Sequence, residues 1–246
     1  MSNAENTTDG EQSFLSHLVE LRTRLLKAVA VVLVILVALI PLANKLYGWL
    51  AKPLLDHLPA GGAMIATDVA SPFFAPLKLA FFVAVFIAMP FILFQGWSFV
   101  SPGLYKHERR LAVPLLASSV MLFYIGCAFA YFLVLPAVFT FMTSVAPEGV
   151  AVMPDISRFL DFALVLFLAF GLCFEVPVAM VILVAIGAAT TEQLIKSRPY
   201  SIVGAFIIAA VLTPPDVISQ LLLAIPMCLL YEVGIFASRL LGKRVT

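Results

Sequence analysis

Two long runs without a charged residue constrain the fold of this chain more than any other feature. Residues 79–100 and 111–146 contain no Asp, Glu, Lys or Arg, and they flank the short charged stretch 101–110, SPGLYKHERR. Runs of this length exceed what a soluble core needs and suit helices that cross a bilayer. Their apolar residues do not alternate with polar ones, so a membrane β-barrel is disfavoured. The sequence therefore predicts an all-α integral membrane protein.

Composition supports this class and excludes several others. Of 246 residues, 63% are hydrophobic and 12% are charged, about half the charged fraction of a soluble domain. The net charge of +1 gives no reason to expect a nucleic-acid partner. Cys127, Cys173 and Cys228 stand singly in apolar runs, so we expect packed thiols and no metal or cofactor. HExxH, GxSxG and Walker A motifs are absent, so the sequence does not predict an enzyme, and no catalytic residue is assigned.

The apolar runs divide the chain into a leader and one membrane domain. We expect a disordered polar leader over residues 1–12 and a single membrane domain over 13–246, with Ser13 capping an amphipathic approach helix. Pro41 and Pro136 are expected to bend the first and third spans. The last two spans are short, and the runs alone leave open six spans or four spans plus a re-entrant hairpin. The six approximate spans are 25–47, 77–100, 111–136, 160–189, 199–213 and 217–238.

The distribution of basic residues predicts the orientation in the membrane. Eleven of the 15 Lys and Arg residues fall on alternate connections. Because positive loops stay in the cytoplasm, both termini and the stretch 101–110 are expected there. The eleven residues are Arg22, Arg24, Lys27, Lys106, Arg109, Arg110, Lys196, Arg198, Arg239, Lys243 and Arg244.

Glu175 is an acidic residue near the middle of the fourth predicted span. An ionised carboxylate at that depth costs about 3 kcal/mol, so such residues usually face a cavity or a partner. The small residues Gly171 and Ala179 lie four positions away on either side, which suggests a close helix contact or a groove open to water. A protonated glutamate that is hydrogen-bonded inside the bundle, with a structural role only, is the alternative.

Three other acids have simpler explanations when they are taken singly. Glu20 has Arg24 four residues later, a common helix-stabilising pair. Glu108 stands among basic residues, where solvation suffices to explain it. Asp216 has Ser219 and Gln220 at the third and fourth positions after it, yet capping of the following helix is a sufficient role.

Five stretches in order resemble one known family. They are HLVELRTRLL (17–26), MIATDVASPFF (64–74), SPGLYKHERR (101–110), FEVP (174–177) and LTPPDVISQ (212–220). Together they resemble TatC, the multispanning subunit of the twin-arginine protein translocase. The resemblance extends over residues 14–239, nearly the whole chain.

The resemblance implies a fold and a function that the residues alone do not give. It implies six transmembrane helices with short helices 5 and 6, both termini cytoplasmic, in a concave bundle with an outer cap. The implied function is a receptor for signal peptides with two consecutive arginines, and the core subunit of a translocase that exports folded proteins using the proton gradient. The implied partners are the single-span proteins TatA and TatB, twin-arginine signal peptides, further copies of the chain and the lipid of the bacterial inner membrane.

The resemblance also assigns roles to individual residues. The implied signal-peptide site comprises Glu20, Arg22, Phe99 and Glu108. The implied polar groove in the membrane comprises Glu175, Thr213, Asp216 and Gln220. Pro53, Arg109 and Arg110 match other positions with a functional role in the family.

Two rival functions remain open on the residues themselves. A proton-coupled transporter of a small solute would use Glu175, but we detect no inverted repeat and only one membrane acid. An intramembrane hydrolase would need a nucleophile beside a base, and the sequence offers no such pair.

Overall fold

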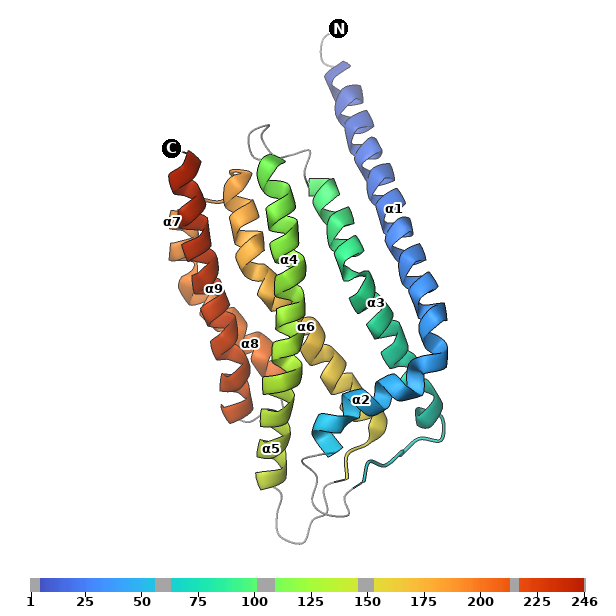
Figure 1. Cartoon of the computed structure of the whole chain (residues 1–246). Helices are drawn as coiled ribbons and strands as arrows, with labels where there is room; N and C mark the ends of the chain where they lie inside the picture. Colours follow the sequence, from blue (N-terminus) through green and yellow to red (C-terminus); the bar gives the residue numbers. More distant parts are fainter. Residues whose placement is uncertain (1–4, 56–62, 101–108, 146–152, 213–216, 246) are drawn as a thin grey trace.

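The computed structural model describes residues 5–55, 63–100, 109–145, 153–212 and 217–245, and every regular element in these ranges is helical (Figure 1). The elements are α1 (Glu5–Leu39), η1 (Ile40–Leu42), α2 (Ala43–Leu55), α3 (Ser71–Val100), α4 (Arg109–Phe129), η3 (Ala130–Val134), α5 (Leu135–Val145), α6 (Ile156–Ala185), α7 (Thr191–Lys196), α8 (Arg198–Leu212) and α9 (Val217–Val245).

The described helices confirm an all-α membrane protein. Five helical segments are long and apolar enough to cross a bilayer: Leu18–Lys52, Ser71–Ser98, Val113–Val145, Ile156–Ala185 and Gln220–Leu240. Helix α8 is also apolar, but its 15 residues give a length of only about 22 Å, less than the ~30 Å hydrocarbon layer.

The bundle has two distinct ends (Figure 1). The N-terminus, the C-terminus and α7 lie at one end, which we call the α7 end. Helix α2 and the final turns of α5 lie at the other, which we call the α2 end. Helix α6 is the central element, because it packs against α3, α4 and α9 and buries thirteen residues along its length, including Leu160, Leu166 and Phe170.

Helices α4 and α6 approach closely through two glycines. A Cβ atom on Gly126 of α4 would lie 2.6 Å from the backbone oxygen of Phe170 in α6. A Cβ atom on Gly171 of α6 would lie 2.5 Å from the Phe123 ring, which is itself 1% exposed. Small residues at such a crossing let two backbones pack directly, which is a common source of helix association in membranes.

Two predicted irregularities arise from prolines. At Pro41 the 3₁₀ turn η1 separates α1 from α2, which turns away from the α1 axis (Figure 1), and this confirms the predicted bend. Near Pro136 the irregularity is the π-helical turn Ala130–Val134, which lies just before the proline. Proline has no amide hydrogen to donate to the carbonyl four residues earlier, and its ring crowds that carbonyl, so the preceding turn widens.

Several helix boundaries differ from the sequence prediction, and one helix was not predicted. Helix α1 begins at Glu5, so residues 5–12 are helical where a disordered leader was predicted, and Ser13 lies inside the helix rather than at its start. A helix already formed by the apolar span propagates at little cost through polar residues. Helix α9 runs to Val245 instead of 238 and is therefore not short, because no proline follows Ser238 and the Leu, Lys and Arg residues there favour helix. The short helix α7 was not predicted, although its Thr190–Gln193 capping box was a readable signal.

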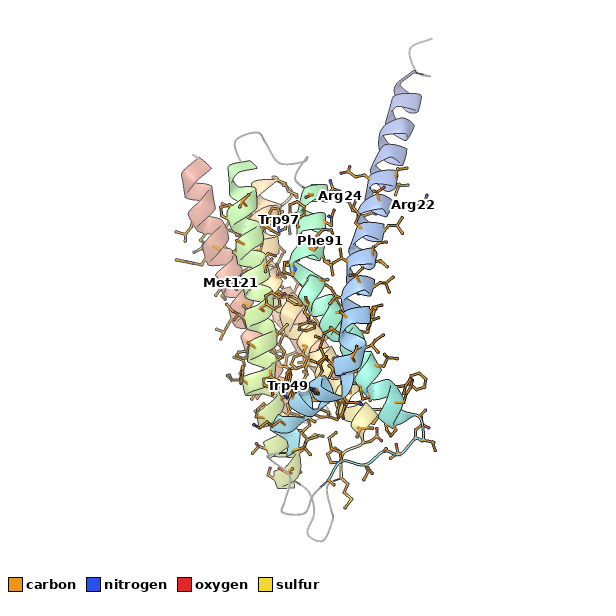
Figure 2. The ribbon with its side chains drawn as sticks, turned by 45° about the vertical axis from the view of Figure 1, so that its right-hand side comes forward. Arg22, Arg24, Trp49, Phe91, Trp97 and Met121 are labelled. Carbon is orange, nitrogen blue, oxygen red and sulfur yellow. The ribbon has the colours of Figure 1, made fainter. Side chains whose placement is uncertain are left out.

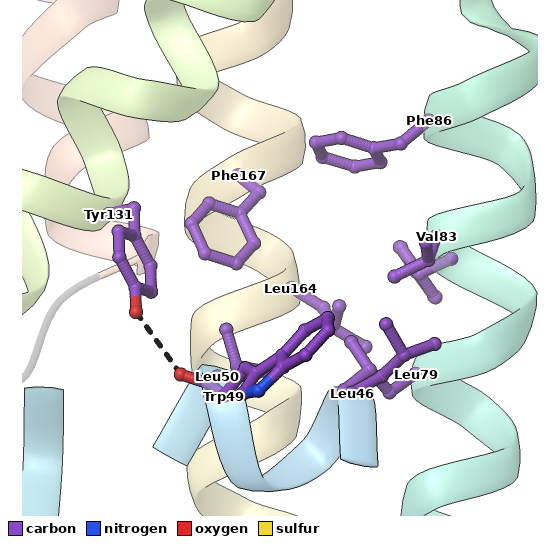
Figure 3. A pocket seen from close by; sticks show the side chains of 10 residues that line it. Leu46, Trp49, Leu50, Leu79, Val83, Phe86, Tyr131, Leu164 and Phe167 are labelled. Atoms are coloured by element: carbon purple, nitrogen blue, oxygen red, sulfur yellow. Dashed lines mark hydrogen bonds between the residues drawn. The ribbon is translucent and has the colours of Figure 1, made fainter. Parts of the chain in front are cut away.

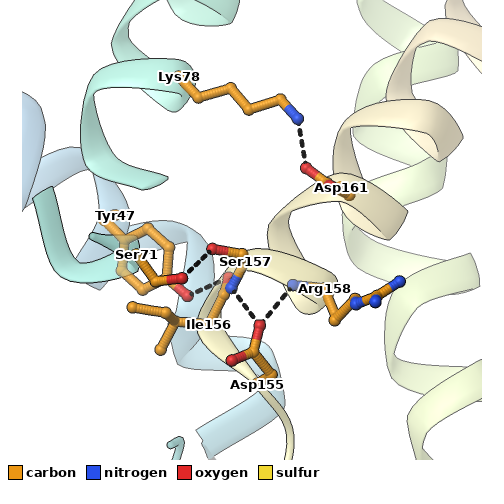
Figure 4. A network of polar contacts seen from close by, with 8 residues as sticks. All are labelled: Tyr47, Ser71, Lys78, Asp155, Ile156, Ser157, Arg158 and Asp161. Atoms are coloured by element: carbon orange, nitrogen blue, oxygen red, sulfur yellow. Dashed lines mark hydrogen bonds and ion pairs between the residues drawn. The ribbon is translucent and has the colours of Figure 1, made fainter. Parts of the chain in front are cut away.

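The connection after α2 is held by Asp155, the N-cap of α6 (Figure 4). Asp155 Oδ1 accepts hydrogen bonds from the amides of Ser157 and Arg158, at 2.9 and 3.0 Å. Its Oδ2 accepts the Thr67 amide and hydroxyl, at 2.9 and 2.7 Å. Ile65 pairs with this segment through backbone hydrogen bonds of 3.0 Å. The described part of the first connection, 63–70, is therefore tied to the start of α6 by hydrogen bonds, although most of its side chains are exposed.

Asp155→Asn is expected to lower the thermal stability at neutral pH. Hydrogen bonds to the ionised form, first of all from the Thr67 amide, hold the pKa of Asp155 well below its usual range. The amide nitrogen of asparagine would face donors instead. Because the folded pKa is depressed, the stabilisation is complete above the unfolded pKa of about 3.9 and disappears as the pH falls through the folded value. Thermal unfolding of the purified protein from pH 7 down to acid measures this effect.

Asp68→Asn is the matched control for this prediction. Asp68 Oδ1 accepts one long hydrogen bond, 3.4 Å from the Ala70 amide, so its replacement should change the unfolding temperature little at any pH. Equal stability of Asp155→Asn and the unmodified protein at pH 7 would contradict the role assigned to Asp155.

Candidate functional site

Glu20 lies near the middle of α1, beside the last turns of α3, and is held by Arg24. Arg24 donates from both Nη2 and Nε to Glu20 Oε1, at 2.5 and 3.0 Å. The Glu20 side chain is 39% exposed, and its second oxygen, Oε2, accepts no hydrogen bond from the described residues. The arrangement therefore fixes the carboxylate while leaving one oxygen for an external donor.

Arg24 also connects α1 to α3. Its Nη1 lies 3.4 Å from Gln95 Oε1 near the end of α3, and Figure 2 shows the side chain between the two helices. Arg22 projects from the opposite side of α1 and is exposed (Figure 2). Arg24 therefore positions Glu20, whereas Arg22 does not belong to that hydrogen-bonded group.

The rest of the predicted signal-peptide site is only partly described. Glu108 lies outside the described residues. Phe99 belongs to α3 and Arg109 and Arg110 begin α4, but their side chains are also outside the description. The end of α3 and the start of α4 both lie at the α7 end (Figure 1). Glu20 is linked to the end of α3 through Arg24, which contacts Gln95.

Glu175 lines a cavity of about 340 Å³ between α3, α4 and α6. The Ser119 hydroxyl of α4 donates to Glu175 Oε2. Its other oxygen, Oε1, is buried and has no hydrogen-bond partner in the described part of the chain. The remaining walls are Ile92, Leu93, Gly96, Trp97, Val178, Ala179 and Ile182. The carboxyl group is thus satisfied on one side and offers a free acceptor beside an apolar cavity.

The two small neighbours of Glu175 have different roles. Ala179 lines the cavity, whereas the space over Gly171 is filled by the Phe123 ring. A cavity and a close helix contact are therefore both present, one turn to either side of Glu175.

A second apolar cavity, of about 360 Å³, lies toward the α2 end (Figure 3). Leu79, Val83 and Phe86 of α3 line it, and they share a helix face with Leu93 and Trp97 of the Glu175 cavity. Tyr131 closes one side and donates to the Trp49 carbonyl oxygen at 3.1 Å. The aromatic contacts Phe86–Phe123 and Phe86–Phe167, with ring centroids 5.4 and 6.1 Å apart, lie on the same stripe. The α3 and α6 faces therefore form an apolar track with one acid.

Of the other predicted groove residues, Gln220 is described, and it does not line the Glu175 cavity. Gln220 Nε2 donates to the Phe206 carbonyl oxygen at 3.2 Å and so ties α9 to α8. Thr213 and Asp216 lie outside the described residues. Pro53 belongs to α2, but its side chain is not described.

Sequence reasoning missed two polar groups of the site. Ser119 is 2% exposed, and its only sequence signal was the Ser118-Ser119 pair in an apolar run. Gln95 accepts the hydrogen bond from Arg24. Its only sequence signal was that of a single polar residue near the end of a span. Neither signal identifies a partner, because each contact joins different helices.

The fold and these groups define a polytopic α-helical membrane protein with a partly exposed carboxylate, Glu20, at one end and a buried one, Glu175, within the bundle. A family model described as Sec-independent protein translocase protein (TatC) matches residues 16–226, and the chain belongs to the TatC family. It is therefore a translocase component rather than an enzyme, and the solute-transporter alternative has no support.

Individual relatives carry the same description. A Halothiobacillus neapolitanus protein is 56% identical over 95% of this chain, which spans 64% of that relative's length. Proteins from Haemophilus influenzae and Escherichia coli K12 are 53% and 54% identical, again over 95% of this chain and over 91% and 90% of their own lengths. Each is described as Sec-independent protein translocase protein TatC. A crystal structure of the twin-arginine translocase receptor TatC superposes with a TM-score of 0.80 at 38% identity, covering 91% of this chain and 98% of that one.

Proposed function

We propose that this chain is the twin-arginine signal-peptide receptor and the core subunit of a translocase for folded proteins. The observation that carries the proposal is Glu20, whose Oε1 is held by Arg24 and whose Oε2 is open at the α7 end. A solved relative with the same fold is described as the twin-arginine translocase receptor.

Two carboxylates suit two consecutive arginines. A guanidinium group donates in a planar fork that matches a carboxylate, and such charge-assisted hydrogen bonds contribute roughly 1.5–3 kcal/mol each. Glu20 would take one arginine and Glu108, directly before Arg109 of α4, would take the other. The Arg24–Gln95 contact would keep α1 in register with α3 while the peptide binds.

The apolar segment of a signal peptide would lie along the face formed by α3 and α6. The two cavities on this face have largely apolar walls, and Glu175 would supply a polar contact at bilayer depth. The single-span partners TatA and TatB would pack against α8 and α9, whose outer faces expose Ile202, Val203, Leu229 and Val233. Further copies of the chain would complete the complex, with the proton gradient as the energy source.

The proposed topology has six spans in the bacterial inner membrane. The five long helices and α8 make up the six, and the short α8 would require local thinning of the bilayer. Basic residues at the α7 end, including Arg22, Arg24, Lys196 and Arg198, support placing both termini in the cytoplasm. The concave face would then be bounded on the outer side by α2 and the segment paired with Asp155.

An export assay tests the proposed function. In cells that lack their own TatC, this chain is expected to restore export of a folded reporter whose signal peptide carries Arg-Arg. The same reporter with Lys-Lys should stay in the cytoplasm, because an ammonium group cannot form the forked contact. Equal export of both reporters, or export of neither with the protein present and folded, would refute the proposal.

Glu175→Ala is expected to lower export about tenfold, while the folded protein persists in the membrane. The variant removes one hydrogen bond to a charged or strongly polar group, and the loss of one such bond corresponds to about this factor. Ser119→Ala is the matched control, since it removes the internal partner of Glu175 but keeps the open oxygen. Glu175→Gln tests charge, and normal export would show that ionisation is unnecessary. Loss of folded protein in Glu175→Ala and Ser119→Ala alike would favour a purely structural role.

A further inference from the structure

A third cavity, of about 700 Å³, lies at the α2 end between α1, α3 and α6. Phe74, Lys78 and Phe81 of α3 line this cavity. They lie on a different face of α3 from the residues of the apolar track beside Glu175. The other lining residues are Leu36, Ile40, Ala75, Leu77, Ser157, Leu160 and Asp161. No step of the proposed export function uses this cavity.

Several apolar residues that line this cavity are exposed on the surface of the bundle. Ile40 is 48% exposed, Phe74 59% and Phe81 44%, and all three belong to helical segments that are long and apolar enough to cross a membrane, or adjoin them. An apolar recess that opens on the bilayer side of a membrane protein accommodates an acyl chain without burying a polar group.

An ion pair crosses the cavity. Lys78 Nζ of α3 lies 2.5 Å from Asp161 Oδ1 of α6, and the two side chains are 49% and 51% exposed (Figure 4). Lysine has two further N–H donors, and Asp161 Oδ2 accepts no hydrogen bond in the described residues. Exposed pairs of this kind contribute at most about 1 kcal/mol, so they admit an additional ligand readily.

Helix length places the pair near the level at which lipid headgroups begin. Helix α6 has 30 residues and is about 45 Å long, so about 15 Å exceeds the ~30 Å hydrocarbon layer. Asp161 lies about 8 Å from the first residue of α6, and Lys78 about 10 Å from the first residue of α3. The two helix starts are level, because Ser157 Oγ donates to Ser71 Oγ at 2.9 Å.

We propose that this cavity binds phosphatidylethanolamine from the leaflet at the α2 end. The lipid's phosphate complements Lys78, its primary ammonium group complements Asp161, and one acyl chain occupies the apolar recess. Phosphatidylglycerol has a phosphate but no cation for Asp161. Phosphatidylcholine has a cation without N–H donors, so it cannot hydrogen-bond the carboxylate. The two opposite charges therefore select one headgroup class.

Lipid titration of the purified, delipidated full chain tests this proposal. Native mass spectrometry is expected to show about fivefold tighter binding of one phosphatidylethanolamine than of phosphatidylcholine or phosphatidylglycerol. Thermal unfolding should show the same order, since a ligand that binds only the folded state stabilises it. Equal binding of the three lipids by the unmodified protein would overturn the proposal without recourse to any variant.

Variants locate the site. Asp161→Asn should abolish the preference for phosphatidylethanolamine. Lys78→Met should weaken the binding of all three lipids. Glu232→Gln is the matched control, because it removes an exposed ion pair of similar geometry, Arg198–Glu232 at 2.6 Å, elsewhere in the bundle. An unchanged preference in Asp161→Asn would overturn the proposal. The proposal would also be overturned if the protein self-associated without lipid and Asp161→Asn abolished this self-association. A second copy of the chain would then occupy the cavity.

Discussion

Gly126→Val is expected to remove most of the folded protein from the membrane. A Cβ atom at this position would lie 2.6 Å from the backbone oxygen of Phe170 and 3.0 Å from Cβ of Phe174. A backbone oxygen cannot rotate away, so α4 and α6 would have to separate, which would open the core around Phe123. Overpacking usually costs 1–3 kcal/mol, and displacement of two packed helices should cost roughly 3 kcal/mol or more, a large part of the stability of a typical domain.

The matched control for Gly126→Val is Gly204→Val in α8. No atom lies within 4 Å of a Cβ placed at Gly204, so this variant tests valine in a helix without the clash. Both variants would be purified in detergent, and their yield of monodisperse protein and their unfolding temperature compared with the unmodified chain. A Gly126→Val protein as stable as Gly204→Val would show that the α4–α6 contact is not as described.

Glu20→Gln is expected to weaken binding of an Arg-Arg signal peptide by about ten- to a hundredfold and to reduce export accordingly. The amide keeps the size of the side chain and one acceptor, but it removes the charge that faces both Arg24 and the incoming guanidinium. Stability should change little, because the Glu20–Arg24 pair is a partly exposed pair within one helix.

Two further variants separate recognition from positioning. Glu192→Gln, which neutralises an acid in the first turn of α7, should leave both peptide binding and export unchanged. Arg24→Gln keeps the Glu20 charge but removes its tether to Gln95, so an intermediate loss of affinity is expected. If Glu20→Gln bound the Arg-Arg peptide as tightly as the unmodified protein, Glu20 would not be a recognition residue.

Features within single segments were predictable from the sequence. Uncharged runs located the membrane helices, because their length and composition are local properties. Pro41 located the bend between α1 and α2 for the same reason, and Glu175 was singled out by the cost of placing an acid within a span. In each case the physical cause lies within one continuous segment of the chain.

Features that join helices were not predictable. Ser119 hydrogen-bonds Glu175 across 56 positions of sequence, and Lys78 meets Asp161 across 83. These contacts depend on how α3, α4 and α6 rotate about their axes, which Gly126, Gly171 and the packed aromatic rings determine together. Several residues on one helix face would satisfy the same sequence pattern, so the pattern alone does not select the partner.

The most direct test of the receptor proposal is the affinity of the purified protein for a signal peptide in its Arg-Arg and Lys-Lys forms, measured also for Glu108→Ala. The proposal predicts that the unmodified protein prefers the Arg-Arg peptide and that Glu108→Ala loses this preference. Equal affinity of the unmodified protein for both peptides would contradict the claim that this chain by itself recognises the arginine pair.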